Sequence, residues 1–171
     1  MQEPIWEIVT PADLTFNPFT LIGKEWMLVT AGNETAHNTL TASWGGLGVL
    51  WKKDVSYIFI RPQRYTMQFL EQEDYYSLCF FDKTYHSALA YCGSHSGKDV
   101  DKDKETGLTV CFDQAAPYYQ EARLVFICKK MSCQQIDPSS FLDETIDEDV
   151  YPQKDYHYLF VGSIEKVLLR K

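Results

Sequence analysis

The stretch from Asn38 to Trp44 combines amide and hydroxyl groups with apolar side chains in a segment predicted to be a short strand. Alternate residues of a strand share a face. The two faces carry these sets: Asn38, Leu40, Ala42 and Trp44 on one, and Thr39, Thr41 and Ser43 on the other. Buried hydroxyl groups need hydrogen-bond partners. A bound heterocycle with carbonyl and imide edges would supply them, whereas a half-exposed edge strand would leave them to water, and the pattern alone supports both.

A second donor-rich run is Arg61-Pro62-Gln63-Arg64-Tyr65-Thr66, where a strand is predicted to end and a helix to begin. Guanidinium groups, a hydroxyl and the free amides of a first helical turn are the donors of anion sites. The alternative is a surface turn with solvated arginines. The third run, Ser96–Lys102, contains Lys98 and Lys102. Either lysine could meet a phosphate or be a solvated surface charge.

Motifs for other chemistries are incomplete. Gly45-Gly46-Leu47-Gly48 lacks the spacing of a dinucleotide fingerprint, and no helix is predicted after it. Ser94-His95-Ser96 places a histidine between serines, but neighbours in sequence seldom form a triad, and no G-x-S-x-G elbow is present. Four thiol and imidazole groups fall within one short stretch without a paired C-x-x-C: Cys79, His86, Cys92 and His95. Buried thiols and surface histidines explain them better than zinc, so no metal is predicted.

Composition narrows the class of protein. The 171 residues suit one domain, 1–171, and 45% of them are hydrophobic. The formal net charge of −8 argues against binding to nucleic acid or to anionic membranes. Neither a signal peptide nor an apolar run of about 20 residues is present. Five scattered cysteines without a C-x-x-C pair indicate reduced thiols and predict a cytoplasmic protein.

Short β-branched and aromatic runs, interrupted by Gly, Pro, Asn and Asp, dominate the chain. They predict strands at 25–31, 39–43, 55–60, 75–81, 108–112, 122–136 and 157–169. Helices are predicted at 64–72 and 85–91, with Gly93 as the stop of the second, and loops at 45–48 and, unless it is a frayed helix, 97–106. Residues 137–155 read as an acidic surface excursion with one helical turn. This order fits a mainly β fold, an antiparallel barrel with a few short helices at its rim, rather than a doubly wound sheet.

Four runs together resemble the flavin reductase-like family, which includes the flavoredoxins. They are Asn38–Gly45, Ile60–Thr66, Ser96–Lys102 and His157–Gly162, and they occur in the family's order and spacing. The resemblance implies a split β-barrel of Greek-key type that binds flavin mononucleotide (FMN). It also implies a homodimer with the flavin near the subunit interface. Asp103 stands where relatives often carry an aromatic residue.

The resemblance assigns roles to these runs. The residues Asn38, Thr39, Leu40, Thr41, Ala42, Ser43 and Trp44 would line the isoalloxazine ring and ribityl chain. Arg61, Arg64, Tyr65 and Thr66 would hold the phosphate, with Arg64 and Thr66 as the favoured contacts. Ser96, Gly97, Lys98 and Lys102 would close over the cofactor, and His157 would lie near the ring. Trp44 could pack against the ring or fill the barrel core.

The implied function is an FMN-dependent oxidoreductase that passes electrons from NADH or NADPH through flavin to an acceptor. The protein would orient the ring and tune it by hydrogen bonds, so no nucleophilic side chain is needed. One alternative is a flavoredoxin-like carrier that holds FMN without efficient oxidation of NAD(P)H. Another is a binding protein for a different flat ligand, such as haem.

Overall fold

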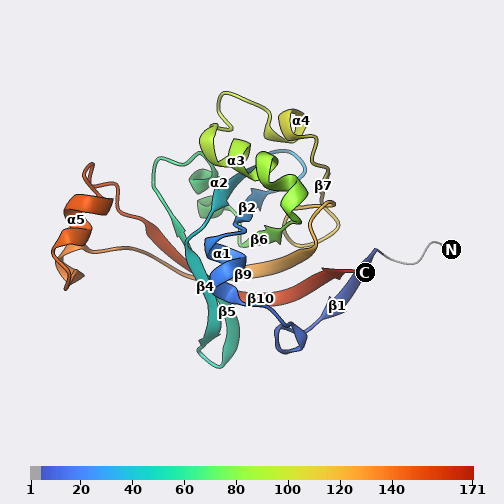
Figure 1. Ribbon diagram of the computed structural model, residues 1–171, viewed down its shortest axis with the longest axis horizontal. Coiled ribbons are helices and arrows are strands. Elements are labelled where there is room, and N and C mark those ends of the chain that lie inside the picture. Colours follow the sequence, from blue (N-terminus) through green and yellow to red (C-terminus); the bar gives the residue numbers. More distant parts are fainter. Residues whose placement is uncertain (1–4) are drawn as a thin grey trace.

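The computed structural model describes residues 5–171, which form one large antiparallel sheet with short helices around it (Figure 1). The strands are β1 (Trp6–Val9), β2 (Met27–Gly32), β3 (His37–Ala42), β4 (Gly45–Leu50), β5 (Lys53–Ile60), β6 (Tyr75–Phe80), β9 (Leu124–Gln135) and β10 (Tyr158–Arg170). Their order is β3-β2-β6-β9-β10-β5-β4, and β1 pairs with β10. Two further strands, β7 (Val110–Cys111) and β8 (Tyr118–Tyr119), form a separate pair.

Short helices connect and cover the strands. They are η1 (Pro11–Asp13), α1 (Pro18–Gly23), α2 (Thr66–Gln72), η2 (Lys83–Tyr85), α3 (His86–Ser94), α4 (Lys102–Thr106), η3 (Pro138–Ser140) and α5 (Thr145–Val150). Figure 1 shows α2, α3 and α4 gathered at one end of the molecule, near β2. The helix α4 begins at a cap in which Asp101 accepts a hydrogen bond from the Lys104 amide, and it ends at Gly107, whose φ is 70°.

The two faces of the sheet pack against two hydrophobic cores. In β6, Leu78 and Phe80 belong to one core and Cys79 to the other. In β9, Phe126 and Val125 divide in the same way. Because both faces of β6 and of residues 124–128 of β9 are buried, these segments are nearly continuous apolar runs rather than alternating ones. The long strands β9 and β10 also shift register at two places, which allows them to bend.

The predicted mainly β, antiparallel fold with few helices is confirmed. The structure adds that the hydrogen-bonded path runs openly from β3 to β4 within residues 5–171, without closing into a ring. The helix predicted at 64–72 is confirmed as α2, although the strand predicted at 108–112 shortens to β7.

Two predictions that rested on glycines were wrong. The loop predicted at 45–48 is the strand β4, paired along its length with β5. A Cβ on Gly45 would lie 2.5 Å from the Tyr57 carbonyl oxygen, so this glycine permits close strand contact instead of a turn. Gly93, predicted to stop a helix, lies inside α3, where an added Cβ would approach the Thr41 side chain at 3.3 Å.

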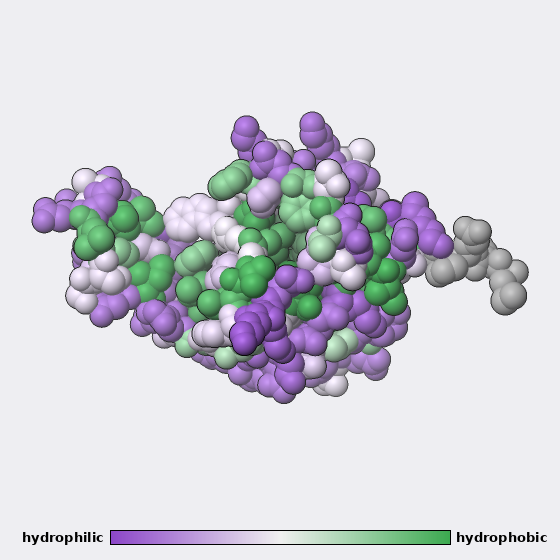
Figure 2. All heavy atoms as spheres, turned by 90° about the horizontal axis from the view of Figure 1, so that it is seen from below, coloured by the Kyte–Doolittle hydropathy of each residue, from purple (hydrophilic) through white to green (hydrophobic). Residues whose placement is uncertain are grey.

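The predicted acidic excursion is an arm between β9 and β10, and it carries two short helices, η3 and α5, where one helical turn was predicted. Figure 1 shows this arm projecting from the body of the molecule at left. Figure 2 shows hydrophobic side chains on the same arm among polar ones. Leu142, which belongs to this arm, is fully exposed.

Candidate functional site

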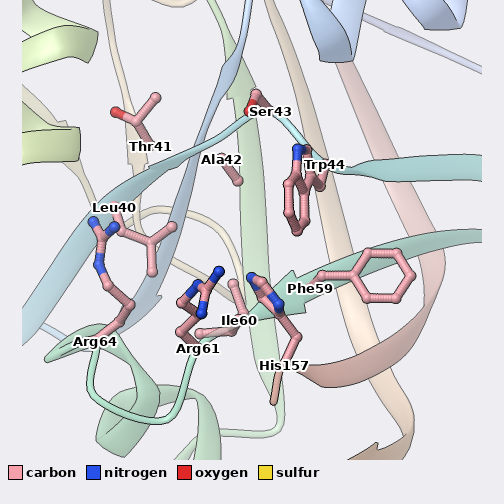
Figure 3. Close-up of a pocket in the computed structure, with 10 residues that line it drawn as sticks. All are labelled: Leu40, Thr41, Ala42, Ser43, Trp44, Phe59, Ile60, Arg61, Arg64 and His157. Atoms are coloured by element: carbon pink, nitrogen blue, oxygen red, sulfur yellow. The ribbon is translucent and has the colours of Figure 1, made fainter. Parts of the chain in front are cut away.

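Two adjoining cavities lie between β3, the end of β5 and α3. The first, the aromatic cavity, has a volume of about 260 Å³ and is lined by Leu40, Thr41, Ala42, Ser43, Trp44, Phe59, Ile60, Arg61, Arg64 and His157 (Figure 3). The second, the cationic cavity, has about 230 Å³ and is lined by Asn38, Gln63, Arg64, Tyr65, Thr66, Gly93, Ser94, His95, Ser96, Gly97 and Lys102. Arg64 lines both, so its guanidinium group marks their junction.

Trp44 and His157 pack against each other in the lining of the aromatic cavity (Figure 3). Their ring centroids lie 5.1 Å apart at an interplanar angle of 44°. Leu40 and Ala42 are buried, whereas Trp44 is 49% exposed. The Phe59 ring points away from the other lining side chains (Figure 3). The cavity therefore has an apolar floor and one aromatic wall that stands open to solvent.

His157 is neutral at pH 7. Its burial and, to a lesser extent, the nearby charge of Arg61 lower the pKa of the imidazole to about 4. The Nδ1 atom shares a hydrogen bond of 2.8 Å with the Tyr151 hydroxyl. This contact orients the ring, so His157 presents an uncharged imidazole to the cavity.

Arg61 is the cation of the aromatic cavity, and its charge is already paired. Its Nη1 lies 2.5 Å from the Asp155 carboxylate, and its Nη2 donates to the Val150 carbonyl at 3.0 Å. Its guanidinium group also stands over the Tyr151 ring, 5.2 Å from the centroid. These contacts tie the arm to the sheet, and they place Arg61 outside the residues that line the cationic cavity.

Two cations, Arg64 and Lys102, line the cationic cavity. Neither forms an ion pair with a carboxylate of residues 5–171. The Lys102 Nζ donates to the Thr39 carbonyl at 2.6 Å and to the Cys92 carbonyl at 2.9 Å. Burial lowers the pKa of Lys102 to about 8 and also lowers the pKa of Arg64. Two positive charges thus gather in a chain whose net charge is −8, which is the electrostatic setting of an anion site.

Polar groups complete the cationic cavity. The Asn38 amide donates to the Thr66 hydroxyl at 2.8 Å, linking β3 to the first residue of α2. A Cβ on Gly97 would lie 2.0 Å from the Asn38 side-chain oxygen, so only glycine allows this loop to approach the strand so closely. The predicted first and second runs therefore meet the third run here. Because α2 has only seven residues, side-chain charges rather than a helix dipole define the site.

Three other residues predicted to bind the cofactor, Thr39, Thr41 and Lys98, make different contacts. The Thr39 hydroxyl bonds the Thr30 hydroxyl at 2.9 Å, and the Thr41 hydroxyl donates to the Leu89 carbonyl. Two of the three hydroxyls for which a heterocycle was a possible partner, those of Thr39 and Thr41, thus have partners within the protein, whereas Ser43 lines the aromatic cavity. Lys98 is exposed, with its Nζ 5.7 Å from the Tyr65 ring centroid, and it does not line the cationic cavity.

Sequence reasoning missed Tyr151 and Asp155 of the arm, which hold His157 and Arg61. It treated 137–155 only as an acidic excursion, and no local pattern connects Asp155 to Arg61, which lies 94 positions earlier in the chain. Within residues 5–171, no cluster of three or more His, Cys, Asp or Glu side chains could hold a metal ion. The described helices also include none that is long and apolar enough to cross a membrane.

Comparisons with known proteins agree with this fold. Three solved structures are similar to the chain. An FMN-binding domain of a flavin reductases-like enzyme from Shewanella baltica OS155 has a TM-score of 0.69 and 15% identity, over 96% of this chain and 77% of that one. A flavoredoxin of Desulfovibrio vulgaris has a TM-score of 0.66 and 21% identity, over 85% and 69%. An NADH:FAD oxidoreductase from Streptomyces globisporus, in complex with NAD and FAD fragments, has a TM-score of 0.62 and 15% identity, over 86% and 74%.

None of the curated proteins matches the chain. The family model described as "Flavin reductase like domain" matches residues 20–171, which include both cavities and every predicted site residue. The chain therefore belongs to the flavin reductase-like family.

Proposed function

We propose that the protein binds FMN across the two cavities and acts as an oxidoreductase that takes electrons from NADH or NADPH. The observation that carries this proposal is the junction at Arg64, where an apolar aromatic cavity meets a cationic one. FMN has the same division, with a flat ring at one end and a phosphate at the other. Membership of the flavin reductase-like family supports the same ligand class.

The chemistry of the lining residues fits FMN at both ends. Trp44, His157 and Leu40 offer flat and apolar surface to the ring, and the Ser43 hydroxyl offers a polar contact at its edge. Arg64, Lys102 and the Thr66 hydroxyl are donors suited to a phosphate. The open aromatic wall at Trp44 leaves room for a second molecule beside the ring.

When bound, flavin supplies the redox chemistry: it accepts a hydride at N5 and releases electrons to an acceptor. The residues of the chain bind and orient it. The neutral imidazole of His157 adds no positive charge beside the ring, and its hydrogen bond to Tyr151 fixes its direction. No nucleophilic side chain is required.

The second candidate is an electron carrier that holds FMN without efficient oxidation of NAD(P)H, which the similarity in fold to a flavoredoxin favours. In both cases we propose a split-barrel homodimer with the flavin near the subunit interface. The half-exposed Trp44 at the mouth of the aromatic cavity supports this arrangement, since a partner subunit could cover it.

The absorption spectrum of the purified protein, before and after anaerobic addition of NADH or NADPH, tests the two candidates. A yellow protein that bleaches rapidly is an oxidoreductase, and one that stays yellow is a carrier. A colourless protein that takes up no added FMN refutes the proposal.

The phosphate assignment has its own test, the double variant Thr66→Val with Arg64→Ala. We expect it to weaken FMN binding at least tenfold, because it removes a hydroxyl donor and an unpaired guanidinium group, and hydrogen bonds to charged groups contribute about 1.5–3 kcal/mol each. Lys24→Ala, which removes an exposed cation outside both cavities, is the control. Unchanged FMN affinity in the double variant would show that the phosphate lies elsewhere.

A further inference from the structure

We propose that Asp103 is a positioning residue, which holds Lys102 at the phosphate end of the site and thereby gives the protein a preference for FMN over riboflavin. This inference rests on the proposed function and extends it to a residue outside the cationic cavity. Asp103 does not line that cavity.

Both carboxylate oxygens of Asp103 have partners on other elements. Oδ2 accepts from the Nε2 of His37 on β3 at 2.6 Å, and Oδ1 accepts from the hydroxyl of Tyr119 on β8 at 2.7 Å. Tyr119 is buried, and the His37 ring packs edge-on against Phe112. These hydrogen bonds lower the pKa of Asp103 against the opposing effect of its burial, so the group is ionised at neutral pH.

Lys102, the residue before Asp103, is bound to the same strand. Its Nζ donates to the carbonyl of Thr39, two positions after His37 on β3. The consecutive side chains of Lys102 and Asp103, at the start of α4, thus form hydrogen bonds to β3 at neighbouring points. A helix of five residues has almost no stability of its own, so such contacts determine where α4 lies. Asp103 provides two of them.

The direction in which FMN affinity changes when Asp103 is replaced distinguishes a positioning role from a purely electrostatic one. A carboxylate near a phosphate repels it, so removing the Asp103 charge should tighten FMN binding if charge alone matters. If Asp103 instead holds Lys102 in place, then losing its contacts should weaken FMN binding. Riboflavin lacks the phosphate, so its affinity should hardly change.

The experiment compares the dissociation constants of FMN and riboflavin for the full chain by quenching of flavin fluorescence. We expect Asp103→Ala to raise the FMN constant roughly tenfold, the equivalent of about 1.4 kcal/mol, and the riboflavin constant less than about twofold. Asp103→Asn removes the same charge but keeps the shape, and its amide can still accept from the Tyr119 hydroxyl and donate to the Nε2 of a neutral His37, so we expect it to restore most of the FMN affinity. Asp99→Ala removes an exposed carboxylate of the neighbouring loop and serves as the charge control.

Tyr119→Phe gives an independent measurement if Asp103→Ala folds poorly, because it removes one hydrogen bond and keeps the buried ring. It should weaken FMN about threefold and leave riboflavin unchanged. Equal losses for both flavins, unchanged FMN affinity, or tighter FMN binding would each overturn the role of Asp103. A wild-type chain that binds neither flavin is a different result, which refutes the proposed function itself.

Discussion

The flavin-free protein should become more stable as the pH rises from 8 to 10.5, because of Lys102. This side chain is 5% exposed, and its ammonium group has two carbonyl partners but no carboxylate within residues 5–171. Burial lowers its pKa to about 8 from the ordinary 10.5. Between these values the unfolded chain keeps a proton that the folded chain has released, and stability rises with pH wherever the unfolded state binds more protons.

The size of the effect follows from the two pKa values. At about 1.4 kcal/mol per pH unit, the interval from 8 to 10.5 corresponds to about 3 kcal/mol. Below pH 8 the folded protein carries the whole penalty of a buried charge. Above pH 10.5 both states hold a neutral amine, and the penalty is gone.

Urea unfolding of the wild type and of Lys102→Met, at intervals from pH 7 to 10.5, measures this change of stability with pH. Other groups titrate in this range, but they are shared by both proteins and cancel in the difference. The carbonyls that Lys102→Met leaves without a donor add an offset that does not depend on pH. We expect the free energy of unfolding of the wild type to rise by about 3 kcal/mol relative to the variant. A difference that stays flat, or that falls with pH, refutes the reasoning.

Two further predictions concern the walls of the cavities. The pKa of His157 is lowered to about 4 from 6.5, so the wild type should lose up to about 3 kcal/mol of stability as the pH falls from 6.5 to 4, and His157→Asn should lack this loss in urea unfolding at each pH. Gly97→Ala places a Cβ 2.0 Å from an Asn38 oxygen, so it should displace the loop and weaken FMN binding at least tenfold in a fluorescence titration. Gly23→Ala meets no atom within 4 Å and is the control, so equal affinities of the two variants would contradict this.

The strands could be predicted from the sequence because their signal is local. Val55–Ile60 and Tyr75–Phe80 are short runs of β-branched and aromatic residues, and the structure contains both within β5 and β6. The loop predicted from the glycines at 45–48 was wrong for the opposite reason, because the role of Gly45 is not local. Gly45 serves a contact with the Tyr57 carbonyl on the next strand, and nothing in its immediate neighbours distinguishes that role from a turn.

The site could be predicted only in part. The resemblance assigned Asn38 to the ring and ribityl chain and assigned Arg64 and Thr66 to the phosphate, whereas the structure places all three in the lining of the cationic cavity. Composition could not distinguish Lys98 from Lys102, four positions apart in the same polar loop. The fold makes the distinction, because Lys102 begins a helix that packs against β3 and is buried, whereas Lys98 remains exposed.

The two arginines of the second run show why charge pairing, rather than residue type, identifies the ligand site. Both follow the same strand, yet Arg61 has the Asp155 carboxylate at 2.5 Å, and its charge is satisfied within the protein. Arg64 is partly buried beside Lys102 with only the Cys92 carbonyl as a shared acceptor. Burying charge costs free energy unless an opposite charge offsets it. An anion bound in the cationic cavity would offset that cost for both side chains at once, and a phosphate is such an anion.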